Sequence, residues 1–465
     1  MGRVPAHPAR RPGRPPRRRP LRPSRLGLPA RRPGRRRPAS PPHGLVDPHA
    51  LRPSVPQPPG PARRGRTAHD VPGGPRRRRP GRSPEVVPLT RSPAPHDAPA
   101  WHSVHVHYHA PDKDGLLLDA VRPLLDGLRG EVAAAYVLRH WRQGPHLRIN
   151  VKAPPPVWRR VVRPRVDETV GAYLREHPST TVLDPAASLP RHRLLAMREQ
   201  ERGPLTPWPP DNSIRDAPYD SRRHVLGSDE EADLLASFYT DATPLLFGML
   251  EHVRAGRDGR TGLALSLMLT IAHTARRIDR SYLSFRMHAE GYLTWAADPA
   301  RARASFERAF AGHRTALTRR VRDVVACLDD VAAPPVPFVR EWAALLERYR
   351  PRVAALMEDG RLVQPTVEPG EAFQPRPGDP PPPGHRDPSE LQRLVFDNPA
   401  YHEAIFATPA FRRYRVLLNY TYLHLTRLGL TPLDRFMTCH LLADAVEEVY
   451  GLSGLDTLRR FSEVS

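Results

Sequence analysis

The chain has 465 residues, a formal net charge of +23 and only two cysteines. Its charge is concentrated at the beginning. Residues 1–100 hold 24 arginines, no lysine and four acidic residues, which leaves +3 for residues 101–465. Because residues 101–465 carry so little net charge, we predict no nucleic-acid partner for them. No run approaches the roughly 18 apolar residues of a membrane span. Cys327 and Cys439 form no CxxC pair, and we expect a reducing, cytoplasmic location.

Residues 1–100 are predicted to be a disordered Arg/Pro-rich segment. They contain 26 of the 59 prolines and no aromatic residue, so they cannot bury enough apolar surface to offset the entropy of ordering. Three interpretations remain open: a disordered tail, an arm that binds a polyanion, or an over-extended reading frame. The last is open because GC-rich DNA read outside a coding frame yields such Lys-free tracts.

A small sheet is predicted to follow. The segment 101–109 alternates Val104, Val106 and Tyr108 with polar residues, which predicts a strand. Leucines and Val121 at helical spacing predict a helix over 114–128. The segment 136–151 then predicts two strands joined by a tight turn at 142–145.

The rest of the chain is predicted to be mostly helical. An amphipathic stretch at 157–177 is followed by loops up to about residue 220. Further helices are predicted at 228–254, 261–277, 298–330, 337–357, 412–428 and 432–450. The stretch 364–387 is a Pro-rich loop or linker. The fold class is therefore α+β, a small antiparallel or mixed sheet packed on a predominantly helical body. Residues 101–451 form one domain and 452–465 a tail.

Two rows of polar side chains should share one face of the predicted sheet. They are His105, His107 and His109 on the first strand, and His146, Arg148 and Asn150 on the last. These rows fit a solvated polar face with structural histidines, a metal site or a wall that faces a substrate. We expect no metal, because no His-x-x-x-His or cysteine pair supplies further ligands.

A second cluster is predicted at 281–290. If this segment is helical, Ser281, Ser284 and His288 share a face, and Arg286 pairs with Glu290 four residues later. Such a segment is either a capped surface helix or a functional cluster.

The segment Tyr136–Val151 resembles a motif of the C-terminal domain of lantibiotic dehydratases. Its Arg-His-Trp…Gly-Pro-His-Leu-Arg form is closer to the free-standing branch of that superfamily, which contains the pyridine synthases of thiopeptide biosynthesis. The resemblance spans roughly residues 101–451. It also draws on the segments 101–109, 112–115, 218–220, 284–290 and 412–443.

The resemblance to dehydratases is incomplete at one motif. His440 lies where elimination domains carry a histidine, but Asp444 and Ala445 replace the Asn–Arg that usually follows. This departure argues mildly against glutamate elimination, and His440 can equally be a helix-core histidine.

The resemblance implies a cofactor-independent enzyme of thiopeptide maturation. It would join two dehydroalanines of a leader-bearing peptide by a formal aza-Diels–Alder cycloaddition, losing water and the leader to form a pyridine. One alternative is the glutamate-elimination subunit of a split dehydratase, and another is a non-catalytic subunit that binds the leader peptide. The implied partners are the dehydrated precursor peptide and the dehydratase and cyclodehydratase of the same pathway.

The expected site residues follow from the two clusters and the resemblance. The expected catalytic residues are Tyr282, Ser284, His288, Arg148 and His146. The expected substrate-binding residues are Arg139, His140, His105, His107, Asn150, Tyr219, Arg286 and His440. No residue is expected to bind a metal.

Overall fold

A computed structural model describes residues 98–296, 298–362 and 388–464. Of the segment 1–100 that was predicted to be disordered, residues 1–97 lie outside the described residues, and Ala100 instead begins the first strand. The predicted loop 364–387 also lies outside the described residues. No helix in these ranges is long and apolar enough to cross a membrane.

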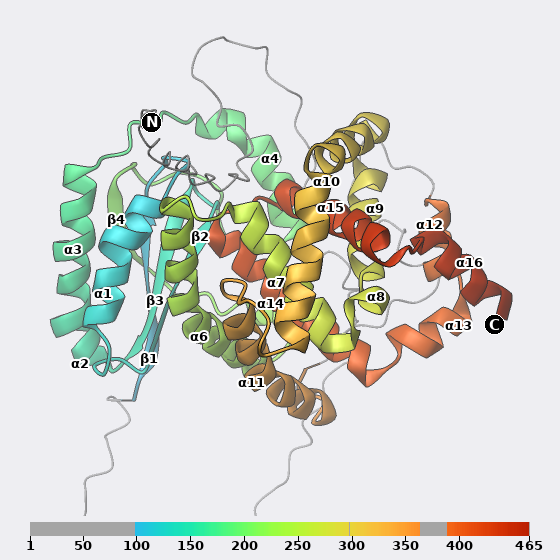
Figure 1. The fold of residues 1–465 in the computed structure, drawn as a ribbon. Helices are drawn as coiled ribbons and strands as arrows, with labels where there is room; N and C mark the ends of the chain where they lie inside the picture. Colours follow the sequence, from blue (N-terminus) through green and yellow to red (C-terminus); the bar gives the residue numbers. More distant parts are fainter. Residues whose placement is uncertain (1–97, 297, 363–387, 465) are drawn as a thin grey trace, which may run out of the picture.

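One small sheet forms the N-terminal part of the fold (Figure 1). Its strands are β1 (Ala100–His107), β2 (Ala134–His140), β3 (His146–Ala153) and β4 (Ser213–Ala217), in the order β2-β3-β1-β4. Every neighbouring pair is antiparallel. Together with the helices below, this sheet confirms the α+β class.

The helices occupy most of the remaining chain. They are α1 (Arg122–Gly127), α2 (Pro155–Val157), α3 (Arg163–Glu176), α4 (Pro185–Arg198), α5 (Arg223–Leu226), α6 (Asp229–Arg254), α7 (Arg260–Arg276), α8 (Ile278–Ser281), α9 (Leu283–Trp295), α10 (Pro299–Asp329), α11 (Val339–Glu358), α12 (Glu390–Phe396), α13 (Pro399–Tyr401), α14 (Pro409–Leu428), α15 (Pro432–Tyr450) and α16 (Gly454–Val464). Single π-helical segments precede α1 at Leu116–Val121, α3 at Trp158–Val162 and α14 at His402–Phe406.

The two faces of the sheet differ in chemistry because side chains alternate along each strand. On one face Val104, Val106, Leu147 and Ile149 are completely buried. The helices α1 and α3 lie beside this part of the sheet in Figure 1, and their leucines and valines belong to the same core. The opposite face carries the histidines and Arg148, and it forms the candidate site.

The helical body is fastened to the sheet by a buried arginine. Arg427 on α14 donates Nε to the carbonyl of Val137 at 3.0 Å, and Nη1 to the carbonyl of Tyr239 at 3.2 Å. A buried guanidinium needs such partners to offset its lost hydration. The bonds join β2, α6 and α14 and fix the orientation of the sheet's polar face.

The caps of two predicted helices confirm where these helices begin. Ser228 accepts from the backbone of Glu231 at 3.0 Å and starts α6, and Asp298 accepts from Arg301 at 3.0 Å and starts α10. Two elements were missed in the segment predicted as loops, namely α4 and β4. Residues 454–464 of the predicted tail form α16, which packs on α12.

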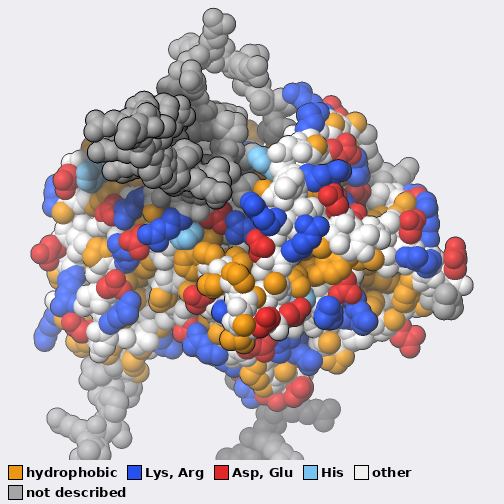
Figure 2. All heavy atoms as spheres, in the orientation of Figure 1, with side chains coloured by type: hydrophobic (Ala, Val, Ile, Leu, Met, Phe, Trp, Pro, Cys, Tyr) orange, Lys and Arg blue, Asp and Glu red, His pale blue; other side chains and the backbone are white. Residues whose placement is uncertain are grey.

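The surface agrees with the low net charge of residues 101–465. On the face shown in Figure 2, basic and acidic side chains are interspersed. The strong positive charge of the whole chain therefore does not extend over this face of the folded part.

Candidate active site

The polar face of the sheet brings four imidazoles together. His105 lies opposite Arg148, and His146 lies opposite both His107 and His140. The His146 ring centroid is 4.6 Å from that of His105, 4.8 Å from that of His107 and 5.3 Å from that of His140. We call these five residues and the buried Asn150 the polar wall.

The imidazoles of the polar wall are neutral at pH 7. Burial, followed by the charge of Arg148, lowers the pKa of His105 to about 3. Burial lowers the pKa of His107 to about 4, and it holds the pKa values of His140 and His146 well below their usual range. A neutral imidazole offers one donor and one acceptor, so the polar wall can both give and receive hydrogen bonds.

These pKa shifts predict a loss of stability in acid. The unfolded chain binds protons at a histidine pKa near 6.5, whereas folded His105 and His107 stay neutral until about pH 3 to 4. Stability should therefore fall as the pH drops below 6.5, by at most about 2 kcal/mol per such histidine at pH 5. Unfolding temperatures measured from pH 7.5 to 5 test this. His105→Gln should flatten the curve, and the exposed control His177→Gln should leave it unchanged; an identical slope in both variants would contradict the prediction.

His146 orients Arg148. Nδ1 of His146 lies 2.8 Å from the carbonyl oxygen of Gly144, which can only accept, so Nδ1 carries the proton. The lone pair of Nε2 then faces Nε of Arg148 at 3.4 Å. Arg148 is 4% exposed, pairs with Asp220 at 3.4 Å, and has no hydrogen-bond partner for Nη2 among the described residues. The Nη2 group is therefore a buried donor without an acceptor among the described residues.

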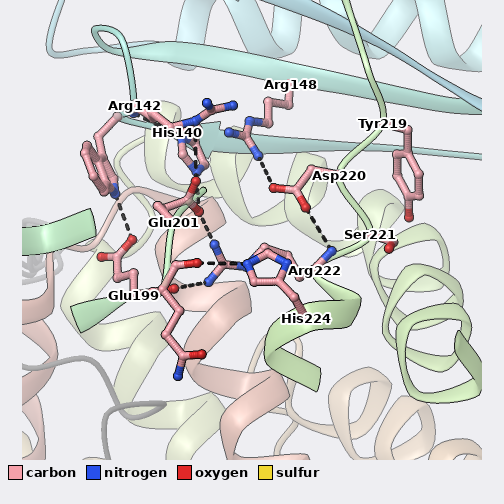
Figure 3. Close-up of polar contacts among 12 residues, drawn as sticks. His140, Arg142, Arg148, Glu199, Glu201, Tyr219, Asp220, Ser221, Arg222 and His224 are labelled. Carbon is pink, nitrogen blue, oxygen red and sulfur yellow. Dashed lines mark hydrogen bonds and ion pairs between the residues drawn. The ribbon is translucent and has the colours of Figure 1, made fainter. Parts of the chain in front are cut away.

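A buried carboxylate closes one end of the polar wall (Figure 3). The side chain of Glu201 is 2% exposed and contacts Nη1 of Arg222. Its Oε1 lies 3.2 Å from Nε2 of His140, and its Oε2 lies 3.4 Å from Nε of Arg142. Glu201 belongs to residues 199–203, which we call the clasp.

Further contacts hold the clasp in place. The Trp141 indole donates to the Glu199 carboxylate at 2.8 Å, and Arg222 donates Nη2 to the Glu199 carbonyl at 2.5 Å. Gly203 has φ of +98°, a backbone conformation that residues with a Cβ rarely adopt. This φ favours glycine at the end of the clasp.

Charged residues surround the polar wall. The guanidiniums of Arg142, Arg148 and Arg222 lie against the carboxylates of Glu201 and Asp220, and the Glu199 carboxylate accepts from Trp141 beside them. Because the imidazoles are neutral, the guanidinium of Arg148 is the group of the polar wall that favours a ligand oxygen that carries or develops negative charge.

Two expected substrate-binding residues lie away from the centre of the polar wall. Tyr219 stacks on Trp101 with centroids 4.9 Å apart and accepts from the Tyr136 hydroxyl at 3.0 Å. Arg139 points to the opposite face, where it pairs with Asp114 at 3.0 Å and donates to the Arg427 carbonyl at 3.0 Å. The structure therefore does not bring Arg139 to the polar wall.

The second predicted cluster forms between α9 and α14. Ser284 donates to the Ser281 carbonyl at 2.8 Å, so its oxygen accepts from the Tyr414 hydroxyl at 2.6 Å. Burial, followed by the charge of Glu447, raises the pKa of Tyr282 to about 12. Desolvation lowers the pKa of His288, which packs between Tyr422 and Phe436, to about 3.

The charged residues of this cluster pair with α15. Arg286 contacts Asp444 and Glu447, each at 2.6 Å. The predicted pair of Arg286 with Glu290 is therefore wrong, and Glu290 pairs instead with Arg303 at 2.9 Å. His440 lies with Nε2 3.1 Å from Asp444 and so belongs to this cluster.

We call Tyr282, Ser284, Arg286, His288 and His440 the α9 cluster. This cluster is separate from the polar wall. Helix α14 contacts the α9 cluster through Tyr414 beside Ser284, and it contacts strand β2 of the sheet through Arg427 beside Val137. Thirteen residues of α-helix span roughly 20 Å. A substrate that reaches both clusters must therefore be an extended molecule such as a peptide.

The described residues provide no obvious metal site. In residues 98–296, 298–362 and 388–464, no three His, Cys, Asp or Glu side chains converge in an arrangement that could hold a metal ion. His109, the third histidine of the predicted row, instead lies 3.8 Å from Asp211.

Comparison with known proteins identifies the family. Residues 101–446 match the model described as the C-terminal part of lantibiotic biosynthesis dehydratases. The chain therefore belongs to the lantibiotic dehydratase C-terminal family, as the sequence predicted.

Two solved structures extend this result. TbtD, the pyridine synthase from thiomuracin biosynthesis, is 37% identical over 76% of this chain and 99% of TbtD, with a TM-score of 0.62. TsrL is 24% identical over 78% of this chain and 98% of its own, with a TM-score of 0.57, and this likeness shows the fold alone. No protein with curated annotation matches the chain.

Proposed function

We propose that this protein is a pyridine synthase that matures a thiopeptide. Its substrate is a leader-bearing precursor peptide with two dehydroalanines, which it joins in a formal aza-Diels–Alder cycloaddition. Loss of water and of the leader peptide as an amide then gives the pyridine. The observation that carries the proposal is the 37% identity to a pyridine synthase over 99% of that protein's length.

The polar wall suits the first stage of this reaction. Two distant alkenes must be held together, and orientation alone can supply roughly 7–11 kcal/mol of barrier lowering. One amide must also adopt its iminol form. The free N–H of Arg148, placed by His146, is a preorganised donor for the oxygen of that amide.

The α9 cluster suits the proton transfers. Each elimination removes a proton from a ring carbon and protonates the departing oxygen or nitrogen. Tyr282 and neutral His288 are the groups we assign to these transfers, with Ser284 held by Tyr414. The whole sequence is redox-neutral, so we expect no redox cofactor.

Glutamate elimination is the second candidate, and the family match supports it. Here a partner protein would glutamylate Ser or Thr, and this chain would remove glutamate to leave a dehydro residue. His440 beside Asp444 would be the acid–base pair. In both cases the implied partners are the precursor peptide and the other modifying enzymes of its pathway.

Mass spectrometry separates the two candidates. The purified protein is incubated with the precursor peptide encoded beside its gene, prepared either with two dehydroalanines or with glutamylated serines. We expect the first substrate to lose water and release its leader as an amide, and the second to remain unchanged. Loss of glutamate from the second substrate without cyclisation of the first would establish elimination instead.

A further inference from the structure

A pocket of about 640 Å³ lies between the start of β2 and helix α6. Trp101 and Lys152 line it from the sheet and are cross-strand neighbours. They share the face of the polar wall, because Trp101 precedes His105 by four residues and Lys152 follows Arg148 by four. At 3.3 Å per residue, the pocket lies roughly 13 Å along the strands from His105 and Arg148.

Lys152 is an unusual residue in this chain. Of 72 basic residues only two are lysines, Lys113 and Lys152. Lys113 is buried and donates to the carbonyls of Tyr108 and Ala110 at 2.5 and 2.7 Å, a role suited to a compact ammonium. Lys152 has no such role. Its Nζ lies 5.9 Å from the Trp101 ring centroid, and it has no hydrogen bond or ion pair among the described residues.

The opposite side of the pocket is one polar face of α6. Asp233, Ser237, Thr240 and Asp241 line the pocket at helical spacing. Asp241 is engaged, because it accepts from the Tyr349 hydroxyl at 3.0 Å. The carboxylate of Asp233 has no hydrogen bond or ion pair in the part of the chain that the structure describes. The hydroxyls of Ser237 and Thr240 donate to the backbone carbonyls of Asp233 and Ala236 at 2.8 and 2.9 Å, so each can only accept from a ligand. The pocket thus offers a free cation, a free carboxylate and two hydroxyl acceptors.

The backbone of β2 completes the pocket. β2 is the outermost strand on its side of the sheet, and Ala133 and Ala134 line the pocket. These small side chains leave room for another chain to approach, and the N–H of Ala133 itself donates to the Lys152 carbonyl at 2.8 Å. This room, the ammonium of Lys152 and the carboxylate of Asp233 together match an extended peptide that carries an acidic residue.

We propose that this pocket is a subsite for the precursor peptide, in which Lys152 pairs with an acidic side chain and Asp233 accepts peptide N–H groups. The inference rests on the proposed function for the identity of the peptide. The pocket is joined to the polar wall by Trp101, stacked on Tyr219, and by the next residue, Asp220, which pairs with Arg148. A span of roughly 13 Å corresponds to about four extended residues, so the acidic residue lies about four residues from the reacting dehydroalanine.

The test measures binding separately from chemistry. The probe is the fluorescein-labelled precursor peptide, and its affinity for the full-length protein is read by fluorescence anisotropy. Lys152→Glu should weaken binding about tenfold or more, as expected for a lost hydrogen bond between charged groups. Lys152→Arg, which keeps the charge, should weaken it less. The control Arg322→Glu makes the same charge change at an exposed position on α10 and should leave the affinity unchanged.

A charge reversal in the peptide gives the decisive comparison. Each acidic residue of the peptide is changed to lysine in turn, and one such change should restore binding to Lys152→Glu. Equal weakening by Arg322→Glu, or no peptide that rescues Lys152→Glu, would overturn the subsite. If the protein forms the pyridine but substitution of Lys152 does not change peptide affinity, the subsite fails and the proposed function stands. If Lys152 controls binding but no pyridine forms, the proposed function fails and the subsite stands.

Discussion

Replacing Arg148 with alanine should reduce pyridine formation about a hundred- to a thousandfold, the usual effect of removing a preorganised donor from a developing oxyanion. Arg148 is 4% exposed, is oriented by His146, and keeps one N–H without a partner among the described residues. Because the donor acts on the reacting amide, the loss should fall on kcat. Precursor binding should change little.

The measurement is single-turnover cyclisation of the bis-dehydroalanine precursor, followed by mass spectrometry, with affinity measured in parallel. Arg165→Ala is the matched control, because Arg165 forms an exposed ion pair with Glu131 at 3.0 Å and should show wild-type rates. Cyclisation by Arg148→Ala at near wild-type rates would remove Arg148 from the mechanism. Arg148→Lys should also cyclise poorly, because an ammonium cannot contact His146, Asp220 and substrate in the same planar geometry.

The strand pattern was sufficient to predict most of the polar wall. Alternation along β1 and β3 determines which side chains share a face, so His105, His107, His146 and Arg148 were placed together from sequence. The same rule places the side chain of Arg139 on the other face of the sheet from that of His140. Its assignment as substrate-binding followed the resemblance rather than the alternation, and the structure places it against Asp114.

The contacts that complete the site could not be read from the sequence. Glu201 contacts His140, which lies 61 residues earlier in the chain. Nothing in the local sequence of the clasp indicates this partner. Strand β4 has only five residues and one strongly apolar side chain, Ile214, so it forms because β1 offers a free edge. Asp220 lies in the segment 218–220, which carries part of the resemblance, and that was the available signal for it.

Tertiary contacts also replaced a predicted local pair. Arg286 and Glu290 are correctly spaced for a bond within one helix. Arg286 instead lies between Asp444 and Glu447 of α15, where it is 8% exposed. Two carboxylates stabilise a buried guanidinium more than one does, and the buried Glu290 pairs with Arg303.

Glu201→Ala should produce the largest loss of stability among single changes near the site. The carboxylate is 2% exposed and contacts Arg222, Arg142 and His140. Removing one partner of a buried charge network typically costs about 3–5 kcal/mol, because the remaining charges stay buried without compensation. The net charge of the polar wall would also rise by one. We therefore expect the variant to unfold about 4–7 °C below wild type.

Thermal unfolding of three variants tests whether the loss comes from charge. Glu131→Ala breaks an exposed pair with Arg165 and should cost less than about 1 kcal/mol. The double variant Glu201→Gln/Arg222→Gln removes one carboxylate and one guanidinium, so it should regain much of the stability lost in Glu201→Gln alone. Equal unfolding temperatures for wild type and Glu201→Gln, or a double variant less stable than the single one, would show that Glu201 does not balance these arginines. Recovery in the double variant would instead show that the clasp stabilises the site by neutralising the guanidiniums around Arg148.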